Sequence, residues 1–535
     1  MTTTADSTSP PTNGLQSTVG RSWAEAFAAF KHPRVIVMLF LGFSAGVPIL
    51  LIFSSLSLWL SEAGVEKSAV TFFSWAALGY SFKFVWAPLV DRLPLPLLSA
   101  RLGRRRAWML LSQLAVIASI LWMAMTDPAS GQSSLSIMAF AAVALGFSSA
   151  TQDIVIDAYR IESAGSDLQA MMSSTYIAGY RIGMIVASAG ALYLASWFGS
   201  LADSYSYTAW MYTYVAMAGV MLIGIVTTLV IKEPVSNRAE DTIHSVSDHV
   251  RFFVLFLIAV LAFVLVFRFT GSFADSAKLK LIETLSNKAL AALLVATARL
   301  SVALLVAGTV ARLMTGIGAV NGPMVRQAYL DPMQDFFSRY GAGLAVLLLA
   351  LVGLYRVSDI VLGVIANVFY LDMGYTKIQI ANVSKVFGLL MTIVGGFSGG
   401  VLAVRFGVMR ILLLGAVLSA LTNLLFIILA KAASPDMPLL FAVIGADNLS
   451  AGLASAAFIA FLSSLTNISF TAVQYAIFSS LMTLFPKVLG GYSGSIVEQM
   501  GYPQFFIMTT LLTIPVILLI LLAGKRFDAQ VTMAE

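Results

Sequence analysis

The chain has 535 residues, of which 59% are hydrophobic and only 11% charged, and its formal net charge is +6. With a mean hydropathy of +0.90, this composition excludes a soluble globular domain and predicts an all-α integral membrane protein. Because the sequence contains no cysteine, disulfides and thiolate metal sites are excluded. We expect no metal site and no nucleic-acid partner, since basic cytoplasmic loops account for the positive charge.

Apolar runs long enough to span a bilayer as helix predict about 14 transmembrane helices, in the order six, two and six. A disordered cytoplasmic tail is expected over residues 1–30 and an N-terminal six-helix bundle over 31–231. The predicted helices of this bundle cover 35–60, 69–90, 107–125, 135–159, 170–197 and 208–231.

The middle of the chain is predicted to hold a cytoplasmic linker over 232–250, followed by an inserted two-helix hairpin and polar connector over 251–340. The hairpin helices are expected at 251–270 and 288–314. A C-terminal six-helix bundle follows over 341–525 and a cytoplasmic tail over 526–535, with helices at 343–371, 377–404, 408–430, 439–465, 469–497 and 502–523.

The distribution of Lys and Arg predicts that both termini are cytoplasmic, because basic loops stay on that side. Lys278, Lys280 and Lys288, between the hairpin helices, disagree with this rule. Residues 59–92 and 370–405 are similar to each other, which indicates two repeats. Parallel six-helix repeats around a central cavity are typical of major facilitator transporters.

A cluster of charged residues follows the second predicted helix. It contains Asp91, Arg92, Gly103, Arg104 and Arg105. The cluster resembles the major facilitator signature, with a longer spacer than usual, and would form ion pairs that close a cytoplasmic gate. The alternative is a simple basic anchor at the membrane surface. The second repeat keeps part of the cluster, namely Arg405 and Arg410.

The fourth predicted helix carries Asp153, Asp157 and Arg160 on one face. Carboxylates in a spanning helix are energetically costly unless they face a partner or water, so their presence is by default a functional hypothesis. Asp153 and Asp157 are therefore proton-coupling candidates, together with Lys83 of the second helix, which we expect to pair with Asp153. A structural ion pair that only locks helices is the alternative, and it is the preferred interpretation for Arg160.

Further polar groups inside predicted helices are substrate-binding candidates. In the first bundle these are Gln152, Tyr180 and Arg181; in the second they are Arg356, Asp359, Lys385, Asp447, Asn448 and Gln474. Each buried polar group needs a partner, so the set favours a polar ligand such as a sugar or peptide. For Arg356 and Asp359, one turn apart, mutual neutralisation is an alternative.

Several stretches resemble the AmpG muropeptide permeases of Gram-negative bacteria: residues 41–48, 82–92, 103–108, 150–158, 179–184, 385–400 and 471–476. The resemblance implies import of anhydro-muropeptides, that is, N-acetylglucosamine-anhydro-N-acetylmuramic acid with or without its stem peptide. It implies a location in the bacterial inner membrane, the proton gradient as driving force in place of a cofactor, and roles in cell-wall recycling and, indirectly, β-lactamase induction. The helices inserted between the two bundles depart from the family pattern.

Two other functions remain open at this point. A transporter of acetyl-CoA or another polar solute would need central arginines, and Arg181 and Arg356 are the candidates. A membrane sensor would bind muropeptide without transporting it. An intramembrane enzyme is disfavoured, since no Ser–His or metal set lies in the predicted spans. We expect a monomer.

Overall fold

The computed structural model describes residues 28–65, 78–200, 204–234, 245–285, 288–490 and 492–534. Within these ranges, 13 helical segments are long and apolar enough to cross a membrane. The helix predicted over 69–90 is described only from Leu78 onward, so it is not one of them. The predicted fold class, an all-helical multi-pass membrane protein, is confirmed.

The N-terminal half contains the first six predicted spans, several of which are interrupted. Its helices are α2 (Pro33–Leu50) and α3 (Leu56–Glu62), joined by the π-turn η2 (Leu51–Ser55); α5 (Leu78–Phe82) and α6 (Ala87–Arg92), joined by the 3-10 turn η4 (Lys83–Val85); α7 (Leu98–Leu102); α8 (Arg104–Ala124); α9 (Gln132–Ser163); α10 (Ser166–Ile185) and α11 (Ala191–Trp197), joined by η6 (Val186–Gly190); and α12 (Tyr207–Val220) with α13 (Leu222–Val230).

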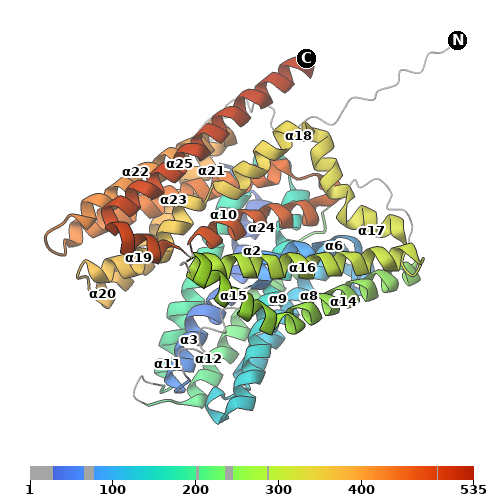
Figure 1. Ribbon diagram of the computed structural model, residues 1–535, viewed down its shortest axis with the longest axis horizontal. Coiled ribbons are helices and arrows are strands. Elements are labelled where there is room, and N and C mark those ends of the chain that lie inside the picture. Colours follow the sequence, from blue (N-terminus) through green and yellow to red (C-terminus); the bar gives the residue numbers. More distant parts are fainter. Residues whose placement is uncertain are drawn as a thin grey trace.

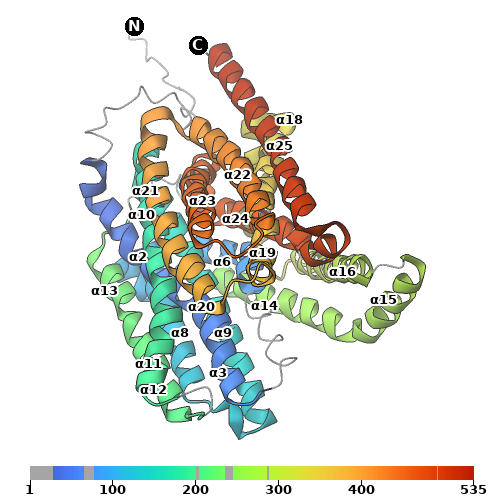
Figure 2. The ribbon, with the colours of Figure 1, turned by 90° about the vertical axis from the view of Figure 1, so that its left-hand side faces the viewer.

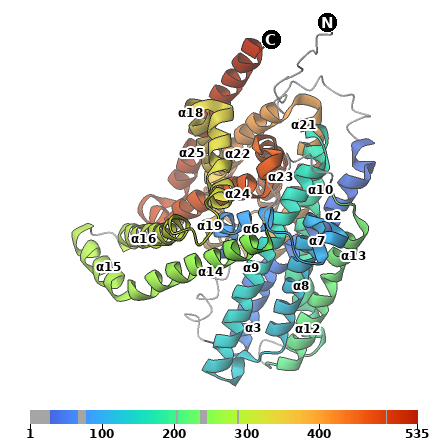
Figure 3. The same cartoon turned by 90° about the vertical axis from the view of Figure 1, so that its right-hand side faces the viewer.

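The inserted segment forms α14 (Val246–Phe269), α15 (Gly271–Leu285), α16 (Lys288–Gly316) and the short helix α17 (Gly322–Tyr329). Figures 2 and 3 show α14, α15 and α16 extending to one side of the bundle. Most apolar side chains of α14 and α16 are exposed, which suits contact with lipid. Near its start α14 is anchored by buried Phe252, whose ring lies 6.2 Å from that of Tyr329.

The C-terminal half begins inside the segment that was predicted as a polar connector. Its helices are α18 (Asp331–Leu354) and α19 (Val357–Asp372); α20 (Lys377–Ile380), the π-turn η7 (Ala381–Phe387) and α21 (Gly388–Phe406); α22 (Val408–Ala430); α23 (Met437–Leu465); α24 (Thr471–Gly490), preceded by η8 (Ile468–Phe470); and α25 (Ser493–Ala534). Figure 1 shows this half, in yellow to red, beside the N-terminal half, in blue to green.

The two repeats share a backbone feature at matching positions. Gly103 precedes α8 with φ 85° and ψ 167°, and Gly407 precedes α22 with φ 88° and ψ 150°. Residues with side chains rarely adopt a positive φ, so glycine is required at both helix starts. The same turn before the third helix of each half supports the internal repeat.

Glycines allow the closest helix contacts. A Cβ atom added to Gly179 of α10 would lie 1.9 Å from the carbonyl oxygen of Leu39 on α2. In the other half, a Cβ added to Gly395 of α21 would lie 2.0 Å from the carbonyl oxygen of Leu449 on α23. Small residues thus bring backbones together where lipid offers no hydrophobic drive for helix association.

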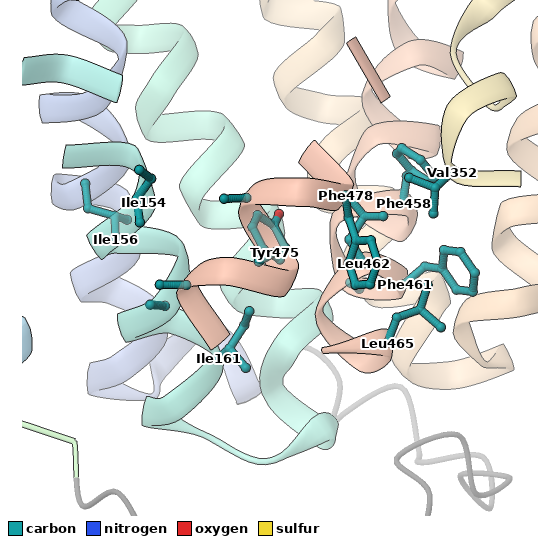
Figure 4. Packing of buried hydrophobic residues seen from close by; sticks show 14 of the residues in the cluster. Ile154, Ile156, Ile161, Val352, Phe458, Phe461, Leu462, Leu465, Tyr475 and Phe478 are labelled. Atoms are coloured by element: carbon teal, nitrogen blue, oxygen red, sulfur yellow. The ribbon is translucent and has the colours of Figure 1, made fainter. Parts of the chain in front are cut away.

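The apolar core is shared at one end of the molecule and divided at the other. One cluster joins both halves and includes Ile154 of α9 and Phe461 of α23. Figure 4 shows Tyr475 of α24 lying between the isoleucines of α9 and the phenylalanines of the C-terminal half. Two further clusters, around Trp59 and around Phe369, each belong to a single half. We call the shared end the gate end, because it holds the charged loop described next.

Candidate functional site

The gate end is held together by Arg105, in the first turn of α8. Its guanidinium lies 2.7 Å from an oxygen of Asp91 and 2.6 Å from an oxygen of Glu162, and all three side chains are buried. The same Arg105 nitrogen donates a 2.9 Å hydrogen bond to the hydroxyl of Thr471, in the other half. Thr471 also hydrogen-bonds to Glu162. The predicted gate charges therefore form a network that connects the two halves.

Gly103 and Glu233 organise the start of α8. The backbone N–H groups of Arg105 and Arg106 donate to the carboxylate of Glu233 at 2.7 and 3.0 Å, which caps the positive end of the helix. A Cβ on Gly103 would lie 2.4 Å from that side chain, so glycine makes room for the cap. Arg104 begins the helix itself.

The remaining predicted gate residues lie around this network. Arg92 donates to the carbonyl oxygen of Gln327 at 3.3 Å and stacks over Phe470 at 5.7 Å. In the second repeat, Arg405 lies over the ring of Phe406, and Arg410 is exposed.

Asp157 is the centre of a second ionic cluster. One of its oxygens lies 3.6 Å from the ammonium of Lys83, and the other lies 3.2 Å from the guanidinium of Arg160. The prediction that Lys83 pairs with Asp153 is therefore wrong. The second helix is interrupted by the turn η4 at Lys83, ahead of Pro88, and the long Lys83 side chain reaches the carboxylate one turn further along α9.

Asp153 lies beside this cluster and is also buried. Its Oδ1 atom makes no hydrogen bond to the described residues. Asp153 has no ion pair there either, in contrast to Asp157, so the two acids of α9 have different environments.

Arg160 does more than lock its own helix. It donates to Ser173 of α10 at 3.2 Å, to Ser463 of α23 at 2.6 Å, and lies over the ring of Tyr475 at 5.1 Å. Its side chain is fully buried. Arg160 therefore connects the carboxylate of Asp157 to two helices of the opposite half.

Two predicted substrate-binding groups take part in contacts within the protein. Gln152 is fully buried and donates to the hydroxyl of Ser44 at 2.9 Å. Gln474 lies at the gate end, where its amide bonds Asp335 at 2.8 Å and Arg339 at 3.1 Å. Both side chains hold helices together in this conformation.

Three of the predicted polar groups of the C-terminal half bond to the neighbouring helices α21 and α22. Asp359 accepts a 2.5 Å hydrogen bond from Ser419, and Asp447 accepts one of 3.2 Å from Thr422, both on α22. Asn448 accepts a 3.0 Å hydrogen bond from Thr392 on α21 and donates to its own helix at 2.9 Å. The side chain of Lys385 lies outside the described part of the chain.

Tyr180 and Arg181 lie on α10, and Arg356 lies at the break between α18 and α19. All three side chains are partly exposed. The Tyr180 ring is 6.0 Å from that of Tyr176. In the described structure Arg356 forms no ion pair with Asp359, so the predicted neutralisation of this pair is absent.

The sequence did not point to Glu162 or Thr471, although both are central to the gate network. Glu162 lies two residues after Arg160 near the end of α9, a position where a second acid could have been noticed. Thr471 is 366 residues away from its partner Arg105, and a hydroxyl gives no comparable signal.

Comparison with solved structures gives the fold independently. Over 94% of this chain, the structure superimposes on the major facilitator transporter FucP in its outward conformation, with a TM-score of 0.56 and 9% identity, and covers 99% of that chain. Over 93% of this chain, it superimposes on the proton:xylose symporter XylE with a TM-score of 0.52 and 10% identity, covering 95% of that chain. The sequence profile of the Major Facilitator Superfamily matches residues 93–354.

These likenesses, with the two halves of the molecule, show that the chain has the fold of the major facilitator class of membrane proteins. Within that class, its sequence resembles the AmpG-type permeases along most of its length. It is 29% identical over 499 residues to the putative transporter AmpG 4 of Rickettsia felis, covering 93% of this chain and 98% of that one. It is 28% identical over 501 residues to the anhydromuropeptide permease of Escherichia coli, covering 93% of this chain and 81% of that one.

Proposed function

We propose that the protein is a proton-driven importer of anhydro-muropeptides in the bacterial inner membrane. The chain-wide similarity to a permease with that named cargo is the observation that carries the proposal. Polar groups from both halves suit a cargo made of sugar and peptide, because each hydroxyl and amide needs a hydrogen-bonding partner once it leaves water. The gate end faces the cytoplasm, as do both termini.

Transport proceeds by rocking of the two halves around the central polar groups. In the described conformation the halves share a core at the gate end and have separate cores at the opposite end. This arrangement suits cargo entry from the periplasm. Opening the gate end requires Arg105 to leave Thr471 and Arg160 to leave Ser463.

Asp157 couples this opening to a proton. As a carboxylate it holds Lys83 and Arg160 by charge. Protonation removes that charge and weakens both ion pairs, since charge-assisted contacts are stronger than neutral ones. Arg160 is then less firmly held against Ser463 and Tyr475, which favours separation of the halves at the gate end. A proton that arrives from the acidic side thus assists cargo release on the other.

The test is uptake of labelled anhydro-muropeptide into vesicles that contain the protein and have an imposed pH gradient, acidic outside. We expect accumulation above equilibrium that a protonophore abolishes. Empty vesicles are the control, and free disaccharide and free peptide serve as competing cargoes.

Each alternative gives a different result. Accumulation that the protonophore leaves unchanged would contradict proton coupling. Saturable binding without accumulation would indicate a sensor, and uptake of acetyl-CoA but not muropeptide would indicate the other transporter class.

A further inference from the structure

Two arginines in the interior of the bundle have no counter-ion in the described structure. Within the described ranges, the side chain of Arg181 on α10 makes a single hydrogen-bond contact, to the sulfur of Met184 at 3.7 Å. Arg356 caps the start of α19, and its side chain makes no hydrogen bond there. By contrast, Lys83, Arg105 and Arg160 each pair with a carboxylate.

The two arginines come from different halves but lie near each other. The positive charge of Arg356 acts on Arg181 across the junction between the halves. The two arginines also lie at the same level of the molecule. Tyr176 and Tyr355, just towards the gate end of each arginine, belong to the shared core, whereas Ala187 and Val357, just beyond, belong to the separate cores.

This level is where the halves part, and both side chains are partly exposed there. Helix α10 is the N-terminal helix that packs on α21 and α23 of the opposite half, which brings Arg181 to the junction. The interruption at Tyr355 and Arg356, between α18 and α19, places the second arginine at the same depth.

Nearby acids are directed elsewhere. Asp359, one turn after Arg356, accepts its hydrogen bond from Ser419 of α22, and Asp447 accepts one from Thr422 of the same helix. These carboxylates are held within the C-terminal half, and neither forms an ion pair with Arg181 or Arg356 in the described structure. Two like charges without a counter-ion inside a membrane protein are unfavourable and mark a functional site.

We propose that Arg181 and Arg356 form a two-sided clamp for a carboxylate of the cargo. A guanidinium binds carboxylate through two parallel hydrogen bonds, and an anion between the two arginines converts their repulsion into attraction. Because each half supplies one arginine, the anion draws the halves together around the cargo. The clamp rests on the proposed function, since anhydro-muropeptides carry a free carboxylate on the muramic acid or on the stem peptide.

The test compares the anhydro-disaccharide as free acid with its methyl ester, using purified full-length protein in proteoliposomes. We expect the wild type to favour the free acid by about 10-fold or more, the size of one charge-assisted hydrogen bond. In Arg181→Gln and in Arg356→Gln this preference falls to about one, while uptake of the ester persists. Arg181→Lys keeps the charge and retains part of the preference. Arg312→Gln, on an exposed part of α16, serves as the control and leaves the preference unchanged.

A binding measurement separates the clamp from the proposed function. In detergent, the free acid should raise the melting temperature of the wild-type protein, whereas the ester should not. Neither compound should raise the melting temperature of the Arg181→Gln or the Arg356→Gln variant. If the wild type takes up neither compound but shows this stabilisation, the clamp stands and the proposed function fails. Three results would overturn the clamp. The variants could keep the preference for the free acid, they could lose uptake of the ester together with uptake of the acid, or the acid could fail to stabilise the wild type.

Discussion

The two acids of α9 have the same residue type and spacing on one helix face, but the structure gives them different partners. Asp157 holds Lys83 at 3.6 Å and Arg160 at 3.2 Å, whereas Asp153 has no ion pair among the described residues. Through Arg160, a change of charge on Asp157 reaches Ser463 in the opposite half. Asp157 is therefore the acid of α9 whose charge is linked to the opposite half.

We predict that Asp157→Asn abolishes accumulation driven by a pH gradient but preserves exchange of labelled for unlabelled cargo. An amide can neither accept nor release the proton, whereas exchange needs no net proton movement. The measurement is gradient-driven uptake beside counterflow in the same vesicles. Asp275→Asn, at an exposed position of α15, is the matched control and should behave as wild type.

Wild-type accumulation by Asp157→Asn would refute the assignment. The variant also leaves two buried cations without their carboxylate, which can cost about 3–5 kcal/mol of stability. Its folded fraction is therefore to be measured by size-exclusion chromatography, and uptake expressed per folded protein.

Residue types and spacing predicted part of the site. The sequence pattern brought out Asp91 and Arg105, because charges at a helix end stand out in an apolar chain. The same reasoning chose Asp153 over Asp157 as the partner of Lys83, since helix depth was counted along an unbroken helix. The turn at Lys83 changes that count, and its effect on the side chain depends on packing that periodicity does not report.

At the scale of elements, glycines determine how closely α2 and α10 approach. We predict that Gly179→Ala lowers the free energy of unfolding by roughly 1–3 kcal/mol, the usual cost of overpacking. The added Cβ would meet the backbone carbonyl of Leu39 at 1.9 Å, so the helices must separate. Thermal unfolding in detergent measures the change.

Gly219→Ala provides the comparison in α12. A Cβ there would meet no atom within 4 Å, so the substitution should stabilise the helix by about 0.5–1 kcal/mol. Equal melting temperatures of the Gly179→Ala and Gly219→Ala variants would contradict this prediction, because they would mean that an added Cβ between α2 and α10 does not destabilise the protein.

Most spanning helices were predictable because 20 apolar residues in a row have few alternatives in a membrane. The elements that were missed are polar. Helix α17 and the first part of α18 lie in the predicted connector, where Asn321 caps α17 and Asp335 bonds Asn467 and Gln474 at the gate end. Their helical structure depends on contacts with distant segments, for which hydrophobic periodicity gives no signal.

At the scale of the whole molecule, the proposed alternating access predicts a rocking motion between the shared and the separate cores, with the pivot near Arg181 and Arg356. The end where the cores are separate must close when the gate end opens, because the halves behave as packed bodies that pivot at the junction. Cargo bound at the junction attracts both halves only when they approach each other. Its binding should therefore favour the conformation in which the end opposite the gate is closed.

Spin labels can follow this motion directly, since the chain has no cysteine of its own. One pair, Ser130→Cys with Ser434→Cys, places labels on exposed loops before the fourth helix of each half, at the end opposite the gate. The other pair, Ala100→Cys with Ser338→Cys, places them on exposed positions at the gate end. Pulsed electron paramagnetic resonance then reports the distance within each pair.

We predict reciprocal changes on addition of anhydro-muropeptide at acidic pH: the Ser130–Ser434 distance shortens and the Ala100–Ser338 distance lengthens. In spin-labelled protein that also carries Arg356→Gln, the cargo should no longer shorten the Ser130–Ser434 distance, because its carboxylate no longer attracts both halves. A shortening at one end without lengthening at the other would mean that the halves bend and do not rock as rigid bodies. Unchanged distances at both ends would contradict alternating access by this cargo, since a ligand that binds both conformations equally shifts neither.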